Sequence, residues 1–201
     1  VPPQLRVGQR WYEGTADAVF HNLHLIEQER PERVLVLSGD HVYTMDYQKM
    51  IEAHERSGAL ATIGAVEVPL AQASAFGVIE IDGRGRVCSF AEKPIAPRPI
   101  PGKPGRALVN MGVYCFERQV LLQALTEDAA TASRHDFGHD VLPALVETGL
   151  LHAYPFVDEN RKHEPYWRDI GTIGSYYEAS MDLVGVDPYF NLYNLEWPLR
   201  T

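Results

Sequence analysis

The sequence predicts an α/β fold in which a parallel sheet carries a ligand site at one edge. Residues 34–37 form a short apolar run rich in β-branched side chains, as in a strand buried on both faces of a parallel sheet. A helical pattern follows, and residues 59–68 form a second such run, which is the alternation that a parallel sheet requires. The first run stops at Ser38-Gly39-Asp40, and ligands of open α/β sheets bind outside this edge. Asp40 is therefore the first candidate for chemistry, although a carboxylate in such a place can simply close a turn.

The composition favours a single globular domain and argues against two classes of partner. The chain has 201 residues, of which 45% are hydrophobic and 22% are charged. No apolar run approaches the roughly 20 residues of a membrane span. Acidic residues outnumber basic ones by nine, and such a field repels nucleic acid. We therefore expect no membrane and no nucleic-acid partner, and an anionic ligand needs a metal ion or a few placed cations.

The cysteines and the first residues bear on the compartment. Cys88 and Cys115 both lie in β-like runs, and we expect them to be buried thiols of a reducing compartment. The chain begins at Val1 with neither an initiator Met nor a signal-peptide pattern, as an internal cut of a longer protein would. These features predict a cytoplasmic protein.

Apolar residues spaced by three and four predict the helices. The first covers residues 15–26, with Thr15 as its N-cap. Asp46 caps a second helix, which Gly58 ends. Further helices are expected at residues 118–125, 136–146 and 175–183, and the polar stretch 126–135 is expected to be mobile.

A hairpin is predicted at residues 76–93, where two alternating runs flank a turn rich in glycine. Glu92 and Lys93 end its second strand, where such a pair is usually solvated. A strand over residues 107–116 is interrupted at Asn110-Met-Gly112, and a glycine there permits close approach of a ligand.

The end of the chain contributes a second acidic turn. Residues 151–156 form a strand-like run, and Asp169 precedes a Gly-Thr turn that opens the last helix. Residues 187–201 are aromatic and rich in turn residues, which is typical of a connector. We therefore expect a main domain over residues 1–184 and a connector over residues 185–201.

Asp40, Asp169 and Lys93 form the chemical core of the prediction. Mg²⁺ is typically held by one or two carboxylates together with substrate phosphates, and a lysine can hold a phosphate as a point charge. Such residues at strand ends point to phosphoryl or nucleotidyl transfer, where positioning and charge neutralisation dominate catalysis. Neither G-x-G-x-x-G nor G-x-x-x-x-G-K-[ST] occurs in the chain, so the spacing alone does not decide the matter.

A set of ordered motifs makes the assignment more specific. The chain closely resembles the bacterial ADP-glucose pyrophosphorylases, the glucose-1-phosphate adenylyltransferases of glycogen synthesis. The resemblance covers nearly the whole chain and rests on Trp11-Tyr-x-Gly-Thr-Ala-Asp-Ala18, Leu37-Ser-Gly-Asp-His41, Ala75-Phe-Gly-Val78, Phe90-Ala-Glu-Lys-Pro94, Met111-Gly-Val-Tyr114, Asp136-Phe-Gly-x-Asp140, Tyr166-Trp-Arg-Asp-Ile-Gly-Thr172 and Trp197-Pro-Leu-Arg-Thr201.

The resemblance implies a fold, a reaction and a multimer. The fold is the Rossmann-like nucleotide-diphospho-sugar transferase type, a mixed, mostly parallel sheet flanked by helices. The reaction converts ATP and α-D-glucose 1-phosphate into ADP-glucose and pyrophosphate with Mg²⁺ as cofactor. The family also implies an allosteric, cytoplasmic homotetramer.

The same resemblance assigns site residues one by one. As catalytic residues, Asp40 and Asp169 hold the metal and Lys93 binds the sugar phosphate. Glu92 binds the glucose hydroxyls. The remaining matches are Tyr12 and Gly77 for glucose 1-phosphate, Gly14 and Thr15 for the turn near the nucleotide base, and Asn110 for a sugar hydroxyl.

Three departures qualify these assignments. Asn110 stands where the family commonly has Ser, although its amide can still bond a hydroxyl. The family's N-terminal Gly-rich loop and its C-terminal left-handed β-helix domain have no counterpart in the sequence. We therefore expect residues 1–201 on their own to lack activity.

Three alternative functions stay open. A non-catalytic regulatory subunit could keep the same fold, although the presence of Asp40, Lys93 and Asp169 favours an active protein. A sister nucleotidyltransferase could use UTP or dTTP, although the turn after Gly14 resembles the adenylyl branch. A plain Rossmann oxidoreductase lacks its glycine fingerprint here.

Overall fold

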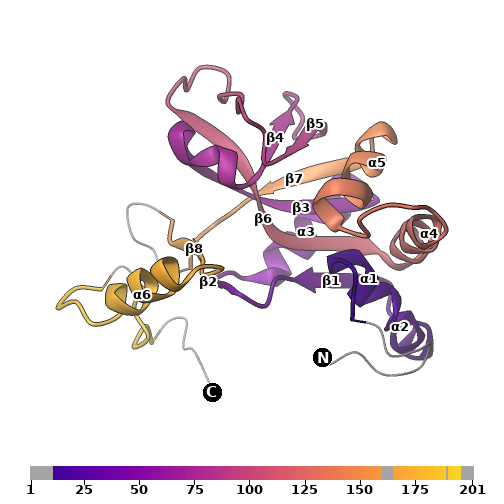
Figure 1. Ribbon diagram of the computed structural model, residues 1–201, viewed down its shortest axis with the longest axis horizontal. Helices are drawn as coiled ribbons and strands as arrows, with labels where there is room; N and C mark the ends of the chain where they lie inside the picture. The colour runs from indigo at the N-terminus through magenta and orange to yellow at the C-terminus, as the bar shows by residue number, and fades with distance from the viewer. Residues whose placement is uncertain (1–10, 160–164, 189, 196–201) are drawn as a thin grey trace.

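The structure is a computed structural model that describes residues 11–159, 165–188 and 190–195. Its main sheet has six strands in the order β5-β4-β6-β3-β7, with β1 also paired to β6, and a two-stranded sheet joins β2 to β8 (Figure 1). The strands are β1 Arg33–Leu37, β2 His41–Tyr43, β3 Ala61–Pro69, β4 Gly77–Ile81, β5 Val87–Glu92, β6 Arg106–Glu117, β7 Leu151–Pro155 and β8 Trp167–Asp169.

Strand β6 is the centre of the sheet. One of its edges pairs with β3, and the other pairs with β1 and, further along, with β4. All of these pairs are antiparallel, and among the described residues only β3 and β7 pair in parallel. The α/β class and the mixed sheet are confirmed, whereas the expected majority of parallel pairs is wrong. The strands β1 and β3 do run in the same direction, but β6 lies between them, so that Phe116 faces both Val34 and Ala61.

Strand β1 differs from the fully buried strand that the sequence predicts. Its first four residues are half-buried and Leu37 is exposed. The side chains of Val34 and Val36 pack on one face of the sheet, and Leu35 packs on the other. Its second edge pairs with no strand among the described residues, which explains the incomplete burial.

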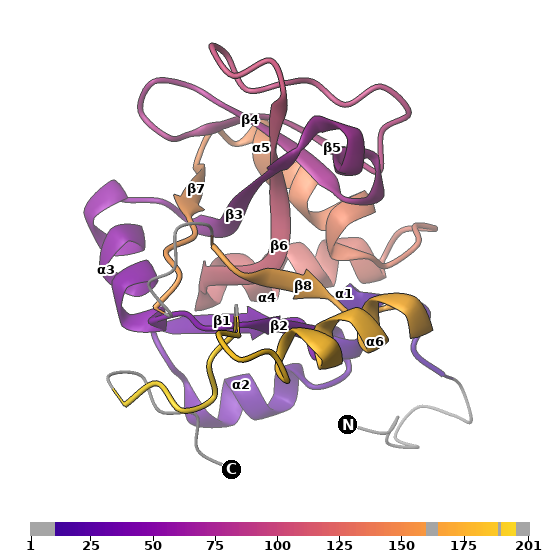
Figure 2. The same ribbon diagram turned by 90° about the vertical axis from the view of Figure 1, so that its left-hand side faces the viewer.

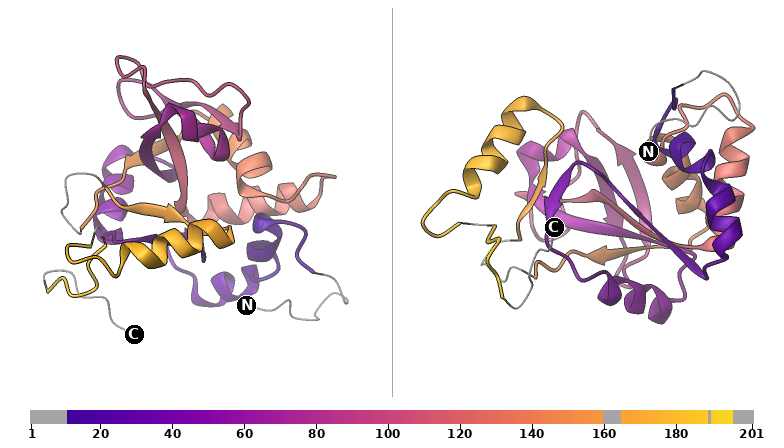
Figure 3. Two further views of the ribbon diagram at one scale, coloured as in Figure 1. Left: turned by 60° about the vertical axis from the view of Figure 1, so that its left-hand side comes forward. Right: turned by 90° about the horizontal axis from the view of Figure 1, so that it is seen from below.

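Helices cover both faces of the sheet. The remaining elements are α1 Thr15–Phe20, α2 Leu23–Glu29, α3 Tyr47–Ser57, the 3₁₀ helix η1 Leu70–Ala75, α4 Arg118–Ala129, the π-helical turn η2 Phe137–Val141, α5 Leu142–Glu147 and α6 Ile173–Asp182. Figure 3 shows α3 on the side of the sheet opposite α1, α2 and α4.

The two cores follow from the two-residue period of strand β6. Tyr114 and Phe116 pack with α1, α4, η2 and α5, whereas Val113 and Cys115 pack with Met50 of α3. A strand with apolar residues at successive positions is thereby buried on both sides. No helix among the described residues has the length and apolar character needed to cross a membrane.

Several local predictions are confirmed. The hairpin consists of β4 and β5, paired antiparallel from Gly77 opposite Glu92. The carboxylate of Asp46 accepts a hydrogen bond from the Gln48 N–H at the start of α3, and Gly58 ends this helix at a φ of 65°. These features depend on short stretches of chain, which is why the sequence predicts them well.

Three local predictions are wrong. The expected helix 15–26 is two helices, and Gly14 rather than Thr15 is the N-cap of α1. The stretch 126–135 is partly helical, because α4 continues to Ala129 with Thr126 bonded to a carbonyl one turn earlier. Cys88 is exposed on the edge strand β5 and not buried.

Other expectations have mixed outcomes. Cys115 is buried, burial raises the pKa of its thiol to about 11, and neither cysteine forms a disulfide.

Figure 2 shows α6 beside the β2–β8 pair, and the segment that follows α6 includes Phe190, whose ring lies 5.2 Å from that of Tyr166. The motif Trp197–Thr201 and the first residues of the chain lie outside the described residues.

Candidate active site

A cavity of about 510 Å³ opens between the β4–β5 hairpin and the β2–β8 pair. It is lined by the ends of several strands and by the first residues of α1 and η2. Seven of the residues singled out from the sequence lie in its wall, and these are Thr15, Asp40, Gly77, Glu92, Lys93, Asn110 and Asp169.

The two-stranded sheet brings Asp40 and Asp169 together. Asp40 follows the turn after β1, and Asp169 is the last residue of β8. Strands β2 and β8 pair so that His41 lies opposite Asp169, and the Ile170 N–H donates to the Asp40 carbonyl at 3.1 Å. Two aspartates 129 positions apart in the sequence thus face one cavity from adjacent strands.

Both aspartates retain free acceptor capacity. The Ser38 hydroxyl donates to Oδ1 of Asp40 at 2.6 Å, and the Gly171 N–H donates to Oδ1 of Asp169 at 2.8 Å. No hydrogen bond from the described part of the chain reaches Oδ2 of either carboxylate. The side chain of Asp40 is 59% exposed, so its second oxygen can meet a ligand.

This pair suits a magnesium ion that substrate also coordinates. Residues 11–159, 165–188 and 190–195 contain no group of three or more His, Cys, Asp or Glu that could hold a metal. Mg²⁺ does not need such a cage, because one or two carboxylates with waters and substrate phosphates suffice. Asp40 and Asp169 therefore fit a metal that binds together with a phosphate-bearing ligand.

Glu92 and Lys93 end strand β5 on another side of the cavity. Lys93 has a φ of 46°, and its N–H donates to the Phe76 carbonyl at 3.1 Å. This conformation leaves the Lys93 side chain 64% exposed and the Glu92 side chain only 16% exposed, with Nζ 4.0 Å from Oε1. The pair is thus not the solvated pair that is usual at a strand end, since Glu92 is shielded from water.

Two glycines make room for the Glu92 carboxylate. A Cβ on Gly77 would lie 2.7 Å from Glu92 Oε2, and one on Gly138 would lie 2.6 Å from the same oxygen. Burial raises the pKa of Glu92, while the positive charge of Lys93 opposes this shift. The carboxylate is therefore placed closely against backbone with few donors around it.

Asn110 lies at the irregularity of β6 that the sequence indicates. Gly112 has a φ of 70°, and its N–H donates to Asn110 Oδ1 at 2.8 Å. The Asn110 amide nitrogen donates to the Tyr114 hydroxyl at 2.9 Å. The pairing of β3 with β6 shifts register at this point, so the bulge presents the Asn110 amide to the cavity.

The residues around the start of α1 divide into two groups. Thr15 lines the cavity, and its hydroxyl donates to Asp136 Oδ2 at 2.9 Å. Gly14 and Tyr12 do not belong to the cavity wall. The Tyr12 hydroxyl accepts a hydrogen bond from Asn22 at 3.3 Å, so the structure places this side chain against α2.

Several wall residues were not assigned a role from the sequence. Asp136 is the N-cap of η2, where its Oδ1 accepts the N–H groups of Gly138 and His139. The motif that begins at Asp136 signals a helix start, and its link to Thr15 depends on residues 121 positions apart.

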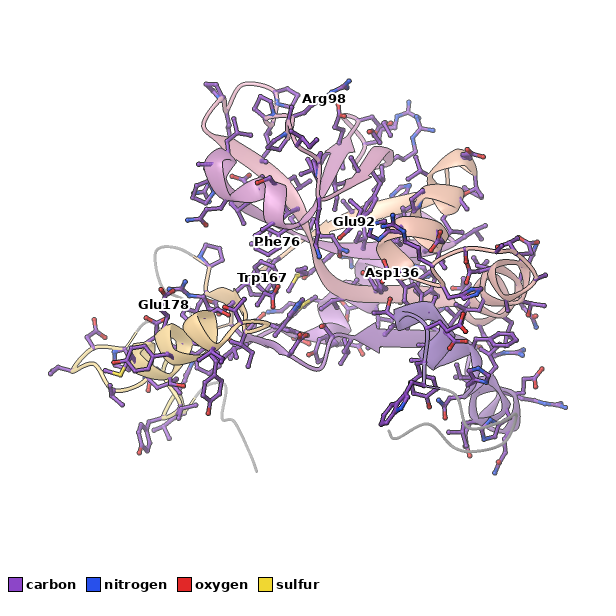
Figure 4. All side chains as sticks on the ribbon, viewed as in Figure 1. Phe76, Glu92, Arg98, Asp136, Trp167 and Glu178 are labelled. Carbon is purple, nitrogen blue, oxygen red and sulfur yellow. The ribbon has the colours of Figure 1, made fainter. Side chains whose placement is uncertain are left out.

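An aromatic cluster forms the other missed part of the wall. Phe76 and Trp167 lie close together (Figure 4), with their ring centroids 5.1 Å apart. The His41 ring meets Trp167 edge-on at 5.2 Å. His41 Nδ1 is 2.8 Å from the Met111 carbonyl, which orients the imidazole. The Trp167 indole N–H is buried without a hydrogen-bond partner among the described residues.

Acidic side chains and a lysine at strand ends face one cavity, which is where ligands of open α/β sheets bind. Residues 4–185 match the family described as nucleotidyl transferase, and the chain belongs to this family. The match covers most of the expected domain 1–184.

The chain is similar along its whole length to curated glucose-1-phosphate adenylyltransferases. It is 48% identical to the protein of that name from Rhodopirellula baltica and 49% identical to the one from Thiobacillus denitrificans, covering 45% and 46% of their lengths. It is 50% identical to glucose-1-phosphate adenylyltransferase 2 of Vibrio vulnificus and covers 50% of it. The chain thus spans about half the length of the curated relatives it matches.

Proposed function

We propose that this protein transfers the adenylyl group of ATP to α-D-glucose 1-phosphate, giving ADP-glucose and pyrophosphate. The observation that carries the proposal is that one cavity has Asp40 and Asp169 on one side and Glu92 and Lys93 on another. The names of the similar proteins support the choice of ATP and glucose 1-phosphate as substrates.

Asp40 and Asp169 would hold the Mg²⁺, which supplies positive charge to the phosphates when it is bound. Each aspartate is held by a local donor on Oδ1, and no donor among the described residues occupies its Oδ2, which supports a metal contact through that oxygen. The chain carries a formal net charge of −9, and local cations must therefore offset its repulsion of two phosphate ligands.

Lys93 would bind the phosphate of glucose 1-phosphate through its exposed ammonium group. The half-buried Glu92 carboxylate beside it would accept hydrogen bonds from sugar hydroxyls, which would replace the water it has lost. Asn110 and Gly77 would complete the sugar side, and Thr15 with Gly14 would form the turn near the base. For Tyr12 we propose only an indirect role, through its hydrogen bond with Asn22 just after the C-terminal end of α1.

We further propose a cytoplasmic homotetramer that acts in glycogen synthesis under allosteric control, with no nucleic-acid or membrane partner. The net negative charge argues against a nucleic-acid partner, and the free thiols suit a reducing compartment. The tetramer, the pathway and the allosteric control rest on the resemblance to the family.

Pyrophosphate release with Mg²⁺ and glucose 1-phosphate tests the proposed function on the full-length protein. We expect activity with ATP and far weaker activity with UTP and dTTP. Preference for UTP or dTTP would assign the protein to a sister enzyme, and no release with any nucleotide would support a regulatory subunit. Omission of Mg²⁺ should abolish turnover, and activity that persists in a chelator would contradict the metal role of Asp40 and Asp169.

A further inference from the structure

Residues 130–136 join the end of α4 to the start of η2, and the last four of them, Ser133 to Asp136, form a short loop beside the cavity. Its residues form hydrogen bonds with each other, with α4 and with α1. This dense bonding contrasts with the mobility that its polar sequence suggests.

The backbone of His135 is bonded to the start of α1. Its carbonyl accepts the N–H of Ala16 at 2.8 Å and that of Asp17 at 3.2 Å. It thereby accepts hydrogen bonds from two N–H groups of the first helical turn that have no acceptor within the helix. A Cβ on Gly14 would lie 2.2 Å from the same oxygen, so loop and helix are in direct backbone contact. His135 has a φ of 52°, which is uncommon for a residue other than glycine.

The side chain of His135 explains how this conformation is held. Nδ1 lies 2.9 Å from Asp128 Oδ2 on α4, and the Ser133 hydroxyl donates to the other oxygen of Asp128 at 2.7 Å. The His135 N–H donates back to Ser133 Oγ at 3.0 Å. The side chains of His135 and Asp128 are 16% and 9% exposed, so water competes little for these bonds.

The next residue, Asp136, connects the loop to the wall of the cavity. Asp136 accepts the Thr15 hydroxyl, and the Phe137 N–H donates to the same hydroxyl at 3.0 Å. Thr15, Asp136 and Phe137 all line the cavity. Their mutual positions are therefore set by the point at which the loop meets α1.

We propose that His135 is a positioning residue, which fixes the loop between Asp128 and α1 and thereby sets the Thr15–Asp136 wall of the cavity. It lies outside the cavity lining and acts through its neighbours. The consequence for substrate binding rests on the proposed function, in which Thr15 lies near the nucleotide and Glu92, beside Asp136, binds the sugar.

The surrounding charges favour the donor form of the imidazole. The hydrogen bond to Asp128 raises the pKa of His135, and the negative charges of Asp128, Asp17 and Glu13 add to this effect. Glu13 Oε2 lies 3.7 Å from Nε2. Nδ1 therefore carries its proton toward Asp128, as a stable link to α4 requires.

Hydrogen exchange measured by mass spectrometry on the full-length protein tests the positioning directly. His135→Ala should raise exchange about tenfold in peptides that cover residues 14–20 and 133–141. Peptides from residues 47–57 should be unchanged, because α3 lies on the other face of the sheet. His24→Ala on α2, which lies outside the cavity lining, is the matched control and should change neither region.

His135→Asn is the rescue variant. Asparagine tolerates a positive φ, and its amide nitrogen is as many bonds from the backbone as Nδ1 of histidine, so it can donate to Asp128. Exchange in this variant should stay within about threefold of the wild type. Asparagine restores the donor but leaves much of the imidazole volume empty, so a merely space-filling role predicts raised exchange in this variant as well.

Steady-state kinetics tests the consequence for binding. His135→Ala should raise KM for ATP and for glucose 1-phosphate by about five- to tenfold and change kcat by less than about threefold. Unchanged exchange in His135→Ala, or equal exchange in the alanine and asparagine variants, would overturn the positioning role. An inactive wild type would refute the proposed function alone, since the exchange experiment still decides the role of His135.

Discussion

Two pairs of carboxylates line the same cavity, and their surroundings differ sharply. Asp40 and Asp169 each have one oxygen bonded to a nearby donor, and no donor from the described part of the chain reaches the other oxygen. Asp136 instead accepts hydrogen bonds on both oxygens, from Thr15, Gly138 and His139. Its neighbour Glu92 is half-buried, and the Lys93 ammonium nitrogen lies 4.0 Å from its Oε1.

The pKa values follow this difference. Burial disfavours the charged form of Asp136, yet the hydrogen bonds from Thr15, His139 and Gly138 outweigh it and lower the pKa. Burial raises the pKa of Glu92, because too few donors compensate. The Asp136 carboxylate is therefore stabilised as an anion by hydrogen bonds within the protein, whereas the Glu92 carboxylate lacks such donors among the described residues. In the proposed function, sugar hydroxyls would supply donors to Glu92, and Asp40 and Asp169 would bind the cation.

The largest effect is expected at the Asp40–Asp169 pair. Asp40→Asn should lower kcat by two to three orders of magnitude, because losing one such electrostatic contact costs about 3 kcal/mol or more in the transition state. KM for glucose 1-phosphate should change little. Asp82→Asn, which removes the same charge from the hairpin turn outside the cavity, is the control. A kcat within about threefold of the wild type would exclude Asp40 as a metal ligand.

For the free energy of unfolding we expect the reverse order, with a larger loss at Asp136 than at Asp40. Asp136→Ala removes the acceptor of several hydrogen bonds and should lower the free energy of unfolding by about 2 kcal/mol. Asp40→Asn should change it by less than about 0.5 kcal/mol, because that side chain is exposed. Urea unfolding monitored by tryptophan fluorescence measures both. Equal losses in the two variants would remove the distinction between a structural and a free carboxylate.

Lys93→Gln should raise KM for glucose 1-phosphate about tenfold or more and leave kcat and KM for ATP nearly unchanged. The reason is that, in the proposed function, the exposed ammonium group of Lys93 would hold the sugar phosphate in the ground state. Kinetics with each substrate varied in turn separates the two constants. Lys103→Gln, which pairs with Glu67 away from the cavity, is the control. A selective defect for ATP would show that Lys93 acts on the other ligand.

The smallest expected effect is on the pH dependence of the free energy of unfolding. Because the pKa of Glu92 is raised in the folded protein, its contribution to stability is present below its unfolded pKa of 4.5 and is lost as pH rises through the folded value. Asp136 has the opposite sign, since its contribution is present above 3.8 and is lost as pH falls through the lowered folded pKa.

Urea unfolding from about pH 4 to about pH 7 checks these signs. Glu92→Gln should flatten the decline of stability with rising pH, and Glu80→Gln on the same hairpin should leave it unchanged. A steeper decline in Glu92→Gln would contradict the assigned direction of the shift.

The sequence by itself determines the features that depend on neighbouring residues. The hairpin, the cap at Asp46, the helix start at Asp136 and the interrupted strand around Gly112 are all confirmed. Local backbone preferences and short-range hydrogen bonds decide such features. The placement of Asp40 and Asp169 at strand ends belongs to the same class.

Only the tertiary structure decides which elements become neighbours. It inserts β6 between β1 and β3, exposes Cys88 on an edge strand, and brings Asp136 to Thr15 while Tyr12 packs against α2. The period of a strand predicts which of its faces are buried, but not which strand lies beside it. That choice depends on contacts between residues far apart in the chain, whose energies emerge only when the whole sheet is packed.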